Sequence, residues 1–186
     1  MNLLKKIWHW VRWALLVLVL AYIGLVLYRI PAVAEQQKTD AAVQKIHSQK
    51  ITLADVTGTN LPPPPDKAHN DATVAGIDKN NNGIRDDVEL WIFSKYPNSA
   101  KIRAAELQYA MTEQMYFTQV FNTETWKAVA EENSRANICL TIVGKNFIEV
   151  RSLVLNTQLR KDEEEKIFDF ITSHGPAKGE PCDVSA

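Results

Sequence analysis

The chain has 186 residues, with 21 Lys and Arg against 22 Asp and Glu, 46% hydrophobic residues and two cysteines. These values exclude a collagen, a coiled-coil rod, a disulfide-dense toxin and a bulk nucleic-acid binder, because each class needs a compositional bias that is missing here. Residues 1–30 carry four basic residues and no acid, whereas the remainder carries 17 basic and 22 acidic residues. We therefore expect the two parts to occupy different solvents.

The first predicted element is a membrane-spanning helix. Trp13 to Tyr28 contains no charge, and Ile7, Val11 and Ile30 extend the apolar stretch on either side. About 20 apolar residues are enough to cross the hydrocarbon of a bilayer, and arginines at the ends can reach the interface. The sequence predicts membrane contact through residues 7–30, with residues 1–30 forming a tail and anchor.

A cleaved signal peptide is the alternative for the same segment. Ala32-Val33-Ala34 is a plausible cleavage site after a basic region and an apolar core, so residues 1–34 would be removed. The length of the apolar run and the charge of Arg29 favour a retained anchor. Lys5, Lys6 and Arg12 place the N-terminus in the cytoplasm by the positive-inside rule, which predicts a single-pass bacterial inner-membrane protein with a periplasmic main domain.

Residues 31–66 are predicted to form a stalk and a proline-rich linker. Residues 32–50 are polar and fit a short exposed helix or stalk, which Pro31 separates from the anchor. Four consecutive prolines at positions 62–65 lack amide donors, so they exclude both helix and sheet and favour a stiff spacer.

Residues 67–186 are predicted to form a small helical bundle, so the expected fold class is mainly α. Apolar residues recur at helical spacing, and no segment alternates for long enough to require a sheet. Expected caps are Asn98 or Ser99, Asn122 or Thr123, and Asp162 with Glu165. The expected helices cover residues 86–97, 100–121, 123–144, 147–154 and 162–175, and the mixed-charge run 160–166 is expected to be an exposed helix start.

Cys139 and Cys182 are predicted to form one disulfide. An even number of cysteines in a small exported domain is most simply a bridge, whereas the alternative is two inert reduced thiols in a cytosolic fold. The bond would close a loop of about 43 residues and contribute about 4 kcal/mol.

The most specific signal is a candidate calcium loop at residues 78–89. A glycine stands at its sixth place, and oxygen-bearing residues stand at the places where one short loop can wrap a hard cation. The expected ligands are Asp78, Asn80, Asn82, the backbone carbonyl of Ile84, Asp86 and Glu89. The alternative is a metal-free turn rich in Asn and Asp that caps the following helix.

This loop resembles EF-hand-like calcium loops, especially those of dockerins and thrombospondin type-three repeats, in which a helix follows the loop but none precedes it. The sequence departs from the EF-hand pattern at Arg85, where a hydrophobic residue is usual, and residues 70–77 read as irregular. The resemblance therefore implies a single half-hand that binds Ca²⁺ as a structural ion. The longer stretch from Leu61 to Ile92 also resembles one in small uncharacterised bacterial membrane-anchored proteins, which implies an envelope location and no particular activity.

The sequence predicts an envelope protein whose calcium-stabilised helical domain serves as an interaction or structural module for an unidentified protein partner, without catalysis. The four histidines show no zinc-binding spacing, and no nucleophile or phosphate-loop motif is present. The alternatives are an envelope hydrolase with dispersed catalytic residues and an accessory subunit of an inner-membrane complex.

Overall fold

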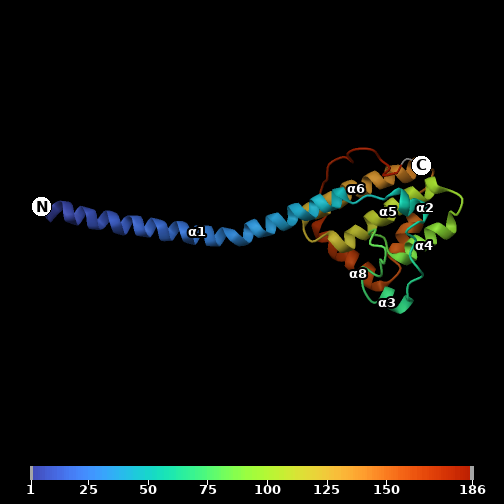
Figure 1. The fold of residues 1–186 in the computed structure, drawn as a ribbon, viewed down its shortest axis with the longest axis horizontal. Coiled ribbons are helices and arrows are strands. Elements are labelled where there is room, and N and C mark those ends of the chain that lie inside the picture. The colour runs from blue at the N-terminus through green and yellow to red at the C-terminus, as the bar shows by residue number, and fades with distance from the viewer. Residues whose placement is uncertain (1, 185–186) are drawn as a thin grey trace. The chain divides into compact units, whose positions relative to one another are not determined.

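The computed structural model describes the backbone of residues 2–184 and the side chains of residues 6–184. The chain divides into two compact units, residues 1–41 and 42–186. Its elements are helical, and no strand occurs among the described residues, which confirms the mainly α fold class. Figure 1 labels helices α1 to α6 and α8.

The first unit is part of a single helix, α1, which spans Asn2–Ser48 and contains Pro31 in its interior. Its apolar side chains from Ile7 to Ile30 are exposed, and none of the apolar window is buried inside the protein. This helix is long and apolar enough to cross a membrane. The sequence predicted that Pro31 would separate the anchor from the next segment, but the helix continues through it. Helices in membranes tolerate proline because neighbouring groups can satisfy the freed carbonyl.

The expected stalk is much shorter than residues 31–66. Ile46, Ile51 and Val56 are buried in the core of the second unit, so the domain begins near Ala42. Sequence analysis assigned these residues to a stalk because three isolated apolar positions do not form a recognisable periodic face. Helix α2 (Leu53–Thr57) follows, with Thr52 and Asp55 forming a capping box at its N-terminus.

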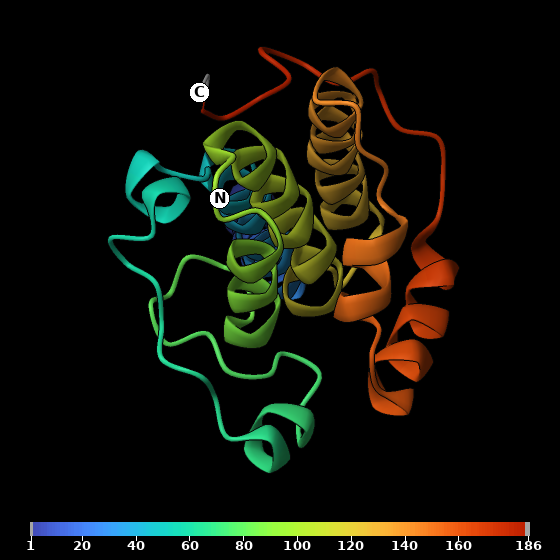
Figure 2. The ribbon, with the colours of Figure 1, turned by 90° about the vertical axis from the view of Figure 1, so that its right-hand side faces the viewer.

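The core of the second unit is built around α5 (Ala100–Gln119), in which every residue from 103 to 115 is buried. Helix α6 (Thr123–Ile142) packs along it, and α2, α4, α7 and α8 also contact it. Figure 2 shows α5 and α6 side by side, with the orange α7 and α8 next to them. A helix that is surrounded in this way needs apolar side chains, or polar side chains with hydrogen-bond partners, on every side. This explains why its sequence shows no single apolar face.

The shorter helices are α3 (Lys67–Asp71), α4 (Asp86–Lys95), α7 (Ile148–Val154) and α8 (Gln158–Ile167), and a 3₁₀ turn covers Phe168–Phe170. Ser99 and Asn122 cap α5 and α6 as expected, because each side chain accepts a hydrogen bond from a backbone amide three residues on. The expected cap at Asp162 is wrong, since Thr157 caps α8 and the helix begins four residues earlier.

A disulfide joins Cys139 in α6 to Cys182, with the two Cα atoms 5.1 Å apart, which confirms the predicted pair. The segment around Cys182 is held further by Asp183, whose carboxylate accepts from the backbone amide of Ile51 at 3.0 Å and also pairs with Arg135. The C-terminal segment therefore closes the domain against both its first and its central parts.

Candidate functional site

The loop from Asp78 to Glu89 follows α3, includes the first turn of α4, and folds back on its own side chains. The carboxylate of Asp78 accepts hydrogen bonds from the backbone amides of Asn82 at 3.2 Å and Gly83 at 2.8 Å. The side-chain oxygen of Asn82 accepts from the amide of Ile84 at 2.9 Å. These bonds give the loop the sharp turn that the glycine at its sixth place predicts, and Gly83 has a φ of 87°.

Gly83 also lies close to a neighbouring segment of the chain. A Cβ at this position would lie 1.9 Å from the side-chain nitrogen of Gln49, and the positive φ disfavours any other residue. The backbone carbonyl of Asn82 accepts from the same Gln49 nitrogen at 3.4 Å. The loop is therefore held against the segment that follows α1.

The second half of the loop begins α4 and is deeply buried. Asp86 and Glu89 are 1% and 0% exposed. The amide of Lys79 donates to Oδ1 of Asp86 at 2.9 Å, and the side-chain nitrogen of Asn80 donates to Oε2 of Glu89 at 3.0 Å. The second oxygen of each carboxylate, Oδ2 of Asp86 and Oε1 of Glu89, is buried without a hydrogen-bond partner.

Burial has the expected electrostatic consequence for these two carboxylates. Desolvation raises the pKa of Glu89 to about 7, although the amides of Asn80 and Asn82 oppose the rise. Desolvation also raises the pKa of Asp86, and repulsion from Asp78 and Asp87 adds to it. Two buried acidic oxygens without a donor are costly in a folded protein unless a cation or a proton satisfies them.

Asp55 is a carboxylate near this site that sequence analysis missed. It is 5% exposed, its Oδ1 lies 3.4 Å from the side-chain nitrogen of Asn82, and its charge contributes to the raised pKa of Glu89. Its Oδ2 caps α2 through Thr52. The position lies outside the loop, and no spacing rule connects it with residues 78–89, so only the folded chain brings it there.

The loop therefore gathers oxygen atoms of the kind that a hard cation prefers. Asp78, Asn80, Asn82, Asp86 and Glu89 lie in one hydrogen-bonded unit, and the side chain of Ile84 enters the core. Within residues 6–184, however, no three His, Cys, Asp or Glu side chains form a ready metal cluster. Binding would depend on amide oxygens and a backbone carbonyl beside the carboxylates, with Asn80 and Asn82 turning their oxygens inward.

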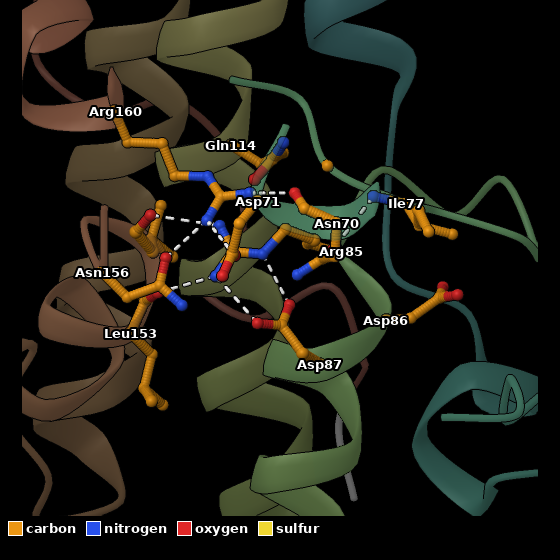
Figure 3. Close-up of polar contacts among 12 residues, drawn as sticks. Asn70, Asp71, Ile77, Arg85, Asp86, Asp87, Gln114, Leu153, Asn156 and Arg160 are labelled. Carbon is orange, nitrogen blue, oxygen red and sulfur yellow. Dashed lines mark hydrogen bonds and ion pairs between the residues drawn. The ribbon is translucent and has the colours of Figure 1, made fainter. Parts of the chain in front are cut away.

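Arg85 holds this loop against a distant part of the domain. Its side chain is buried, forms an ion pair with Asp87, and donates to the backbone carbonyls of Leu153 at 2.7 Å and Val154 at 3.1 Å (Figure 3). These contacts tie the loop to the end of α7.

Arg160 extends the same network and corrects a prediction. Sequence analysis placed it in an exposed run, but its guanidinium is fully buried and donates to the carbonyl of Asn70 at 2.6 Å and to the side-chain oxygen of Asn156 at 2.5 Å (Figure 3). Burial and the nearby charge of Arg85 lower the pKa of Arg160, and an ion pair with Asp71 opposes this. The rest of the run is exposed or only partly buried.

Comparison of the chain with known protein families, with curated proteins and with solved structures finds no match.

Proposed function

We propose that this chain is a single-pass protein of a bacterial envelope, whose exported helical domain is a calcium-stabilised binding or structural module and not an enzyme. The observation that carries the proposal is the exposed apolar surface of α1, on which the side chains from Ile7 to Ile30 are solvent-facing. A helix that is apolar on all sides and covered by nothing is stable in lipid and not in water.

The orientation follows from charge and from cysteine chemistry. Lys5, Lys6 and Arg12 precede the apolar run, which favours an N-terminus in the cytoplasm. The Cys139–Cys182 bond then lies on the outer side, where disulfides persist, and it would be reduced in the cytosol. Charge and redox chemistry thus support the same topology independently.

Membrane retention and topology can be tested together on the full chain with a C-terminal epitope. We expect the protein to stay in the membrane after carbonate extraction, to keep residues 1–34 by intact mass, and to lose the epitope when protease is added to intact spheroplasts. A chain that begins at Glu35 would instead establish a cleaved signal peptide. An epitope protected until the cells are lysed would reverse the topology.

Calcium is proposed as the ion that satisfies Asp86 and Glu89. The oxygens of Asp78, Asn80, Asn82, Asp86 and Glu89 with the carbonyl of Ile84 would hold it, and Asp55 would add a further carboxylate from α2. The unpartnered buried oxygens of Asp86 and Glu89 support this assignment, because a hard cation would remove their desolvation cost. The bound ion would link α2, the loop and the first turn of α4.

The test is thermal unfolding of the full chain in maltoside micelles, with calcium or with a chelator. We expect calcium to raise the midpoint, Asp78→Ala to abolish the rise and Asp55→Asn to reduce it. Thr52→Ala is the matched control for Asp55, because it removes the capping partner and keeps the carboxylate. It should lower the midpoint equally in both conditions.

The outcomes separate the two parts of the calcium proposal. If Asp78→Ala leaves the calcium response intact, the loop is not the site and the calcium proposal fails. If Asp78→Ala abolishes the response while Asp55→Asn preserves it fully, the loop binds calcium without Asp55.

A further inference from the structure

A separate cavity lies among α5, α6, α7 and α8, and no residue of the candidate calcium site lines it. Its volume is about 300 Å³, which is the lower end of the range for small-molecule sites. Six aromatic side chains form much of its wall, namely Tyr109, Tyr116, Phe117, Trp126, Phe147 and Phe168. Such a lining is typical of a small-molecule site.

The cavity also holds a chain of three charged groups. Glu113, which is 2% exposed, accepts from Nη1 of Arg151 at 2.6 Å, and Nη2 of the same guanidinium donates to Glu164. Asn133 donates to the other oxygen of Glu113 at 2.9 Å. Two carboxylates and one guanidinium give this chain a formal charge of −1 when all three are ionised.

The two carboxylates differ in what they can offer a ligand. Both oxygens of Glu113 already accept hydrogen bonds, from Asn133 and from Arg151. The side chain of Glu164 is 23% exposed, and among the contacts of the described residues it meets Arg151 through Oε1 alone. Glu164 lines the cavity, and its Oε2 has no hydrogen bond among the described residues, so this carboxylate keeps acceptor capacity for a ligand.

The mouth of the cavity is apolar and exposed. Phe168 and Ile171 line it and are 57% and 52% exposed, and Phe147 on the α7 side is 44% exposed. Covering these side chains lowers the free energy, because apolar surface is removed from water. A ligand with an apolar body would cover them and carry its polar end inward.

We propose that this cavity binds a small organic cation, an amine carried on an apolar or aromatic body. Aromatic faces attract a cation through their quadrupole, and the effect grows when the group is desolvated. Glu164 supplies the countercharge, and the guanidinium of Arg151, already shared by two carboxylates, is a poor partner for an anion. The domain is then a receptor for a soluble amine as well as a calcium-stabilised module.

Three probes that share one ring and differ in charge test this inference on the full chain in maltoside micelles. They are 2-phenylethylamine, 2-phenylethanol and 3-phenylpropionate, titrated by calorimetry with empty micelles as the blank. We expect the amine to bind at least about tenfold more tightly than the alcohol, because it adds a desolvated ion pair. The carboxylate should bind most weakly.

Two variants and a matched control assign the contacts. Glu164→Gln should lower the affinity for the amine about tenfold and leave the alcohol unchanged, whereas Phe168→Ala should weaken both probes. Glu163→Gln is the control, since Glu163 is the neighbouring residue of α8, pairs with Lys166 and does not line the cavity. It should bind all three probes like the unaltered chain.

Several results would overturn the inference. The cation assignment fails if the alcohol or the carboxylate binds as tightly as the amine, or if Glu164→Gln binds the amine normally. The cavity is no receptor for this ligand class if none of the probes gives heat above the blank. Thermal midpoints of the variants show that each protein is folded during the titration.

Discussion

At the scale of single residues, two buried arginines connect several segments of this domain. Arg85 and Arg160 are among its largest fully buried side chains, and their donors are directed at backbone carbonyls and carboxylates. A guanidinium has five donors in a fixed plane, so it can connect several chain segments at once. Such a residue is costly to bury and more costly to mispair.

Arg85→Lys is expected to destabilise the domain by about 3 kcal/mol, because the ammonium keeps the charge but cannot reach Asp87 and two carbonyls together. Urea unfolding followed by circular dichroism measures the change. Lys101→Met, at an exposed position of α5, is the control and should stay within about 0.5 kcal/mol of the unaltered protein. A loss that is no larger for Arg85→Lys than for the control would contradict this role.

Glu106 should make stability depend on pH. It is buried in α5 with Oε2 unpartnered, and desolvation raises its pKa from 4.5 to about 7. The folded protein then keeps a proton that the unfolded chain releases above pH 4.5. The stability associated with this group is full below that pH and falls as pH rises toward 7.

Replacing Glu106 removes this dependence. Between pH 4.5 and pH 7.5, Glu106→Gln should gain about 1–3 kcal/mol relative to the unaltered protein, measured by urea unfolding in constant calcium. Glu124→Gln, at an exposed position of α6, should show no such gain. Parallel pH profiles for Glu106→Gln and the unaltered protein would mean that this carboxyl titrates normally.

At the scale of elements, a side-chain cap marks the start of five helices of the domain, whereas α4 and α7 begin without one. Thr52, Asp66, Ser99, Asn122 and Thr157 each accept a hydrogen bond from an amide of the first turn. Ser99 and Asn122 could be predicted because a proline or a polar break stands before them. Thr157 was missed because Asp162 and Glu165, three residues apart, offer a more familiar pattern inside the same helix.

Thr157→Ala and Asp162→Ala distinguish these two caps. The first should cost about 1 kcal/mol, because the amide of Arg160 loses its acceptor. Among the described residues, Asp162 accepts from an exposed Gln158 side chain alone, so its replacement should cost a few tenths of a kcal/mol. Chemical denaturation of both variants gives the comparison, and equal losses would return the helix start to Asp162.

Features that depend on local contacts could be predicted from the sequence, whereas features that depend on distant contacts could not. Helices α4 to α7, the disulfide pair and the turn at Gly83 depend on local spacing or on few residues, so the sequence predicts them. Asp55 near the loop and the burial of Arg160 depend on contacts across many residues, and a single sequence has no periodic signal for these. The burial of Ile46 also depends on distant contacts, and its sequence neighbours are polar, so the sequence does not predict it.

At the scale of the whole molecule, the disulfide and Asp183 join the last described segment to the rest of the domain. Cys182 is bonded to α6, Asp183 pairs with Arg135, and the amide of Asp183 donates to Gln108 of α5 at 2.9 Å. The residues from 172 to 182 have no helix of their own, so these contacts order the segment. The bond therefore stabilises the domain where secondary structure does not.

Replacing both cysteines by serine should lower the free energy of unfolding by about 4 kcal/mol, because the unfolded chain regains the freedom of a loop of 43 residues. Urea unfolding with and without a thiol reductant measures this. The reductant should shift the unaltered protein toward the double variant and leave the double variant unchanged. The prediction would be contradicted if the reductant left the free energy of unfolding of the unaltered protein unchanged.

The hydrogen bond between the amide of Ile51 and the carboxylate of Asp183 also limits how early the domain can finish folding. These residues are 132 positions apart, and a ribosome adds about 5–20 residues per second, so the N-terminal edge of the domain waits roughly 7–26 s for its partner. During that time the backbone amide of Ile51 lacks the carboxylate of Asp183. The first and last parts of the domain can therefore join only after Asp183 has been synthesised.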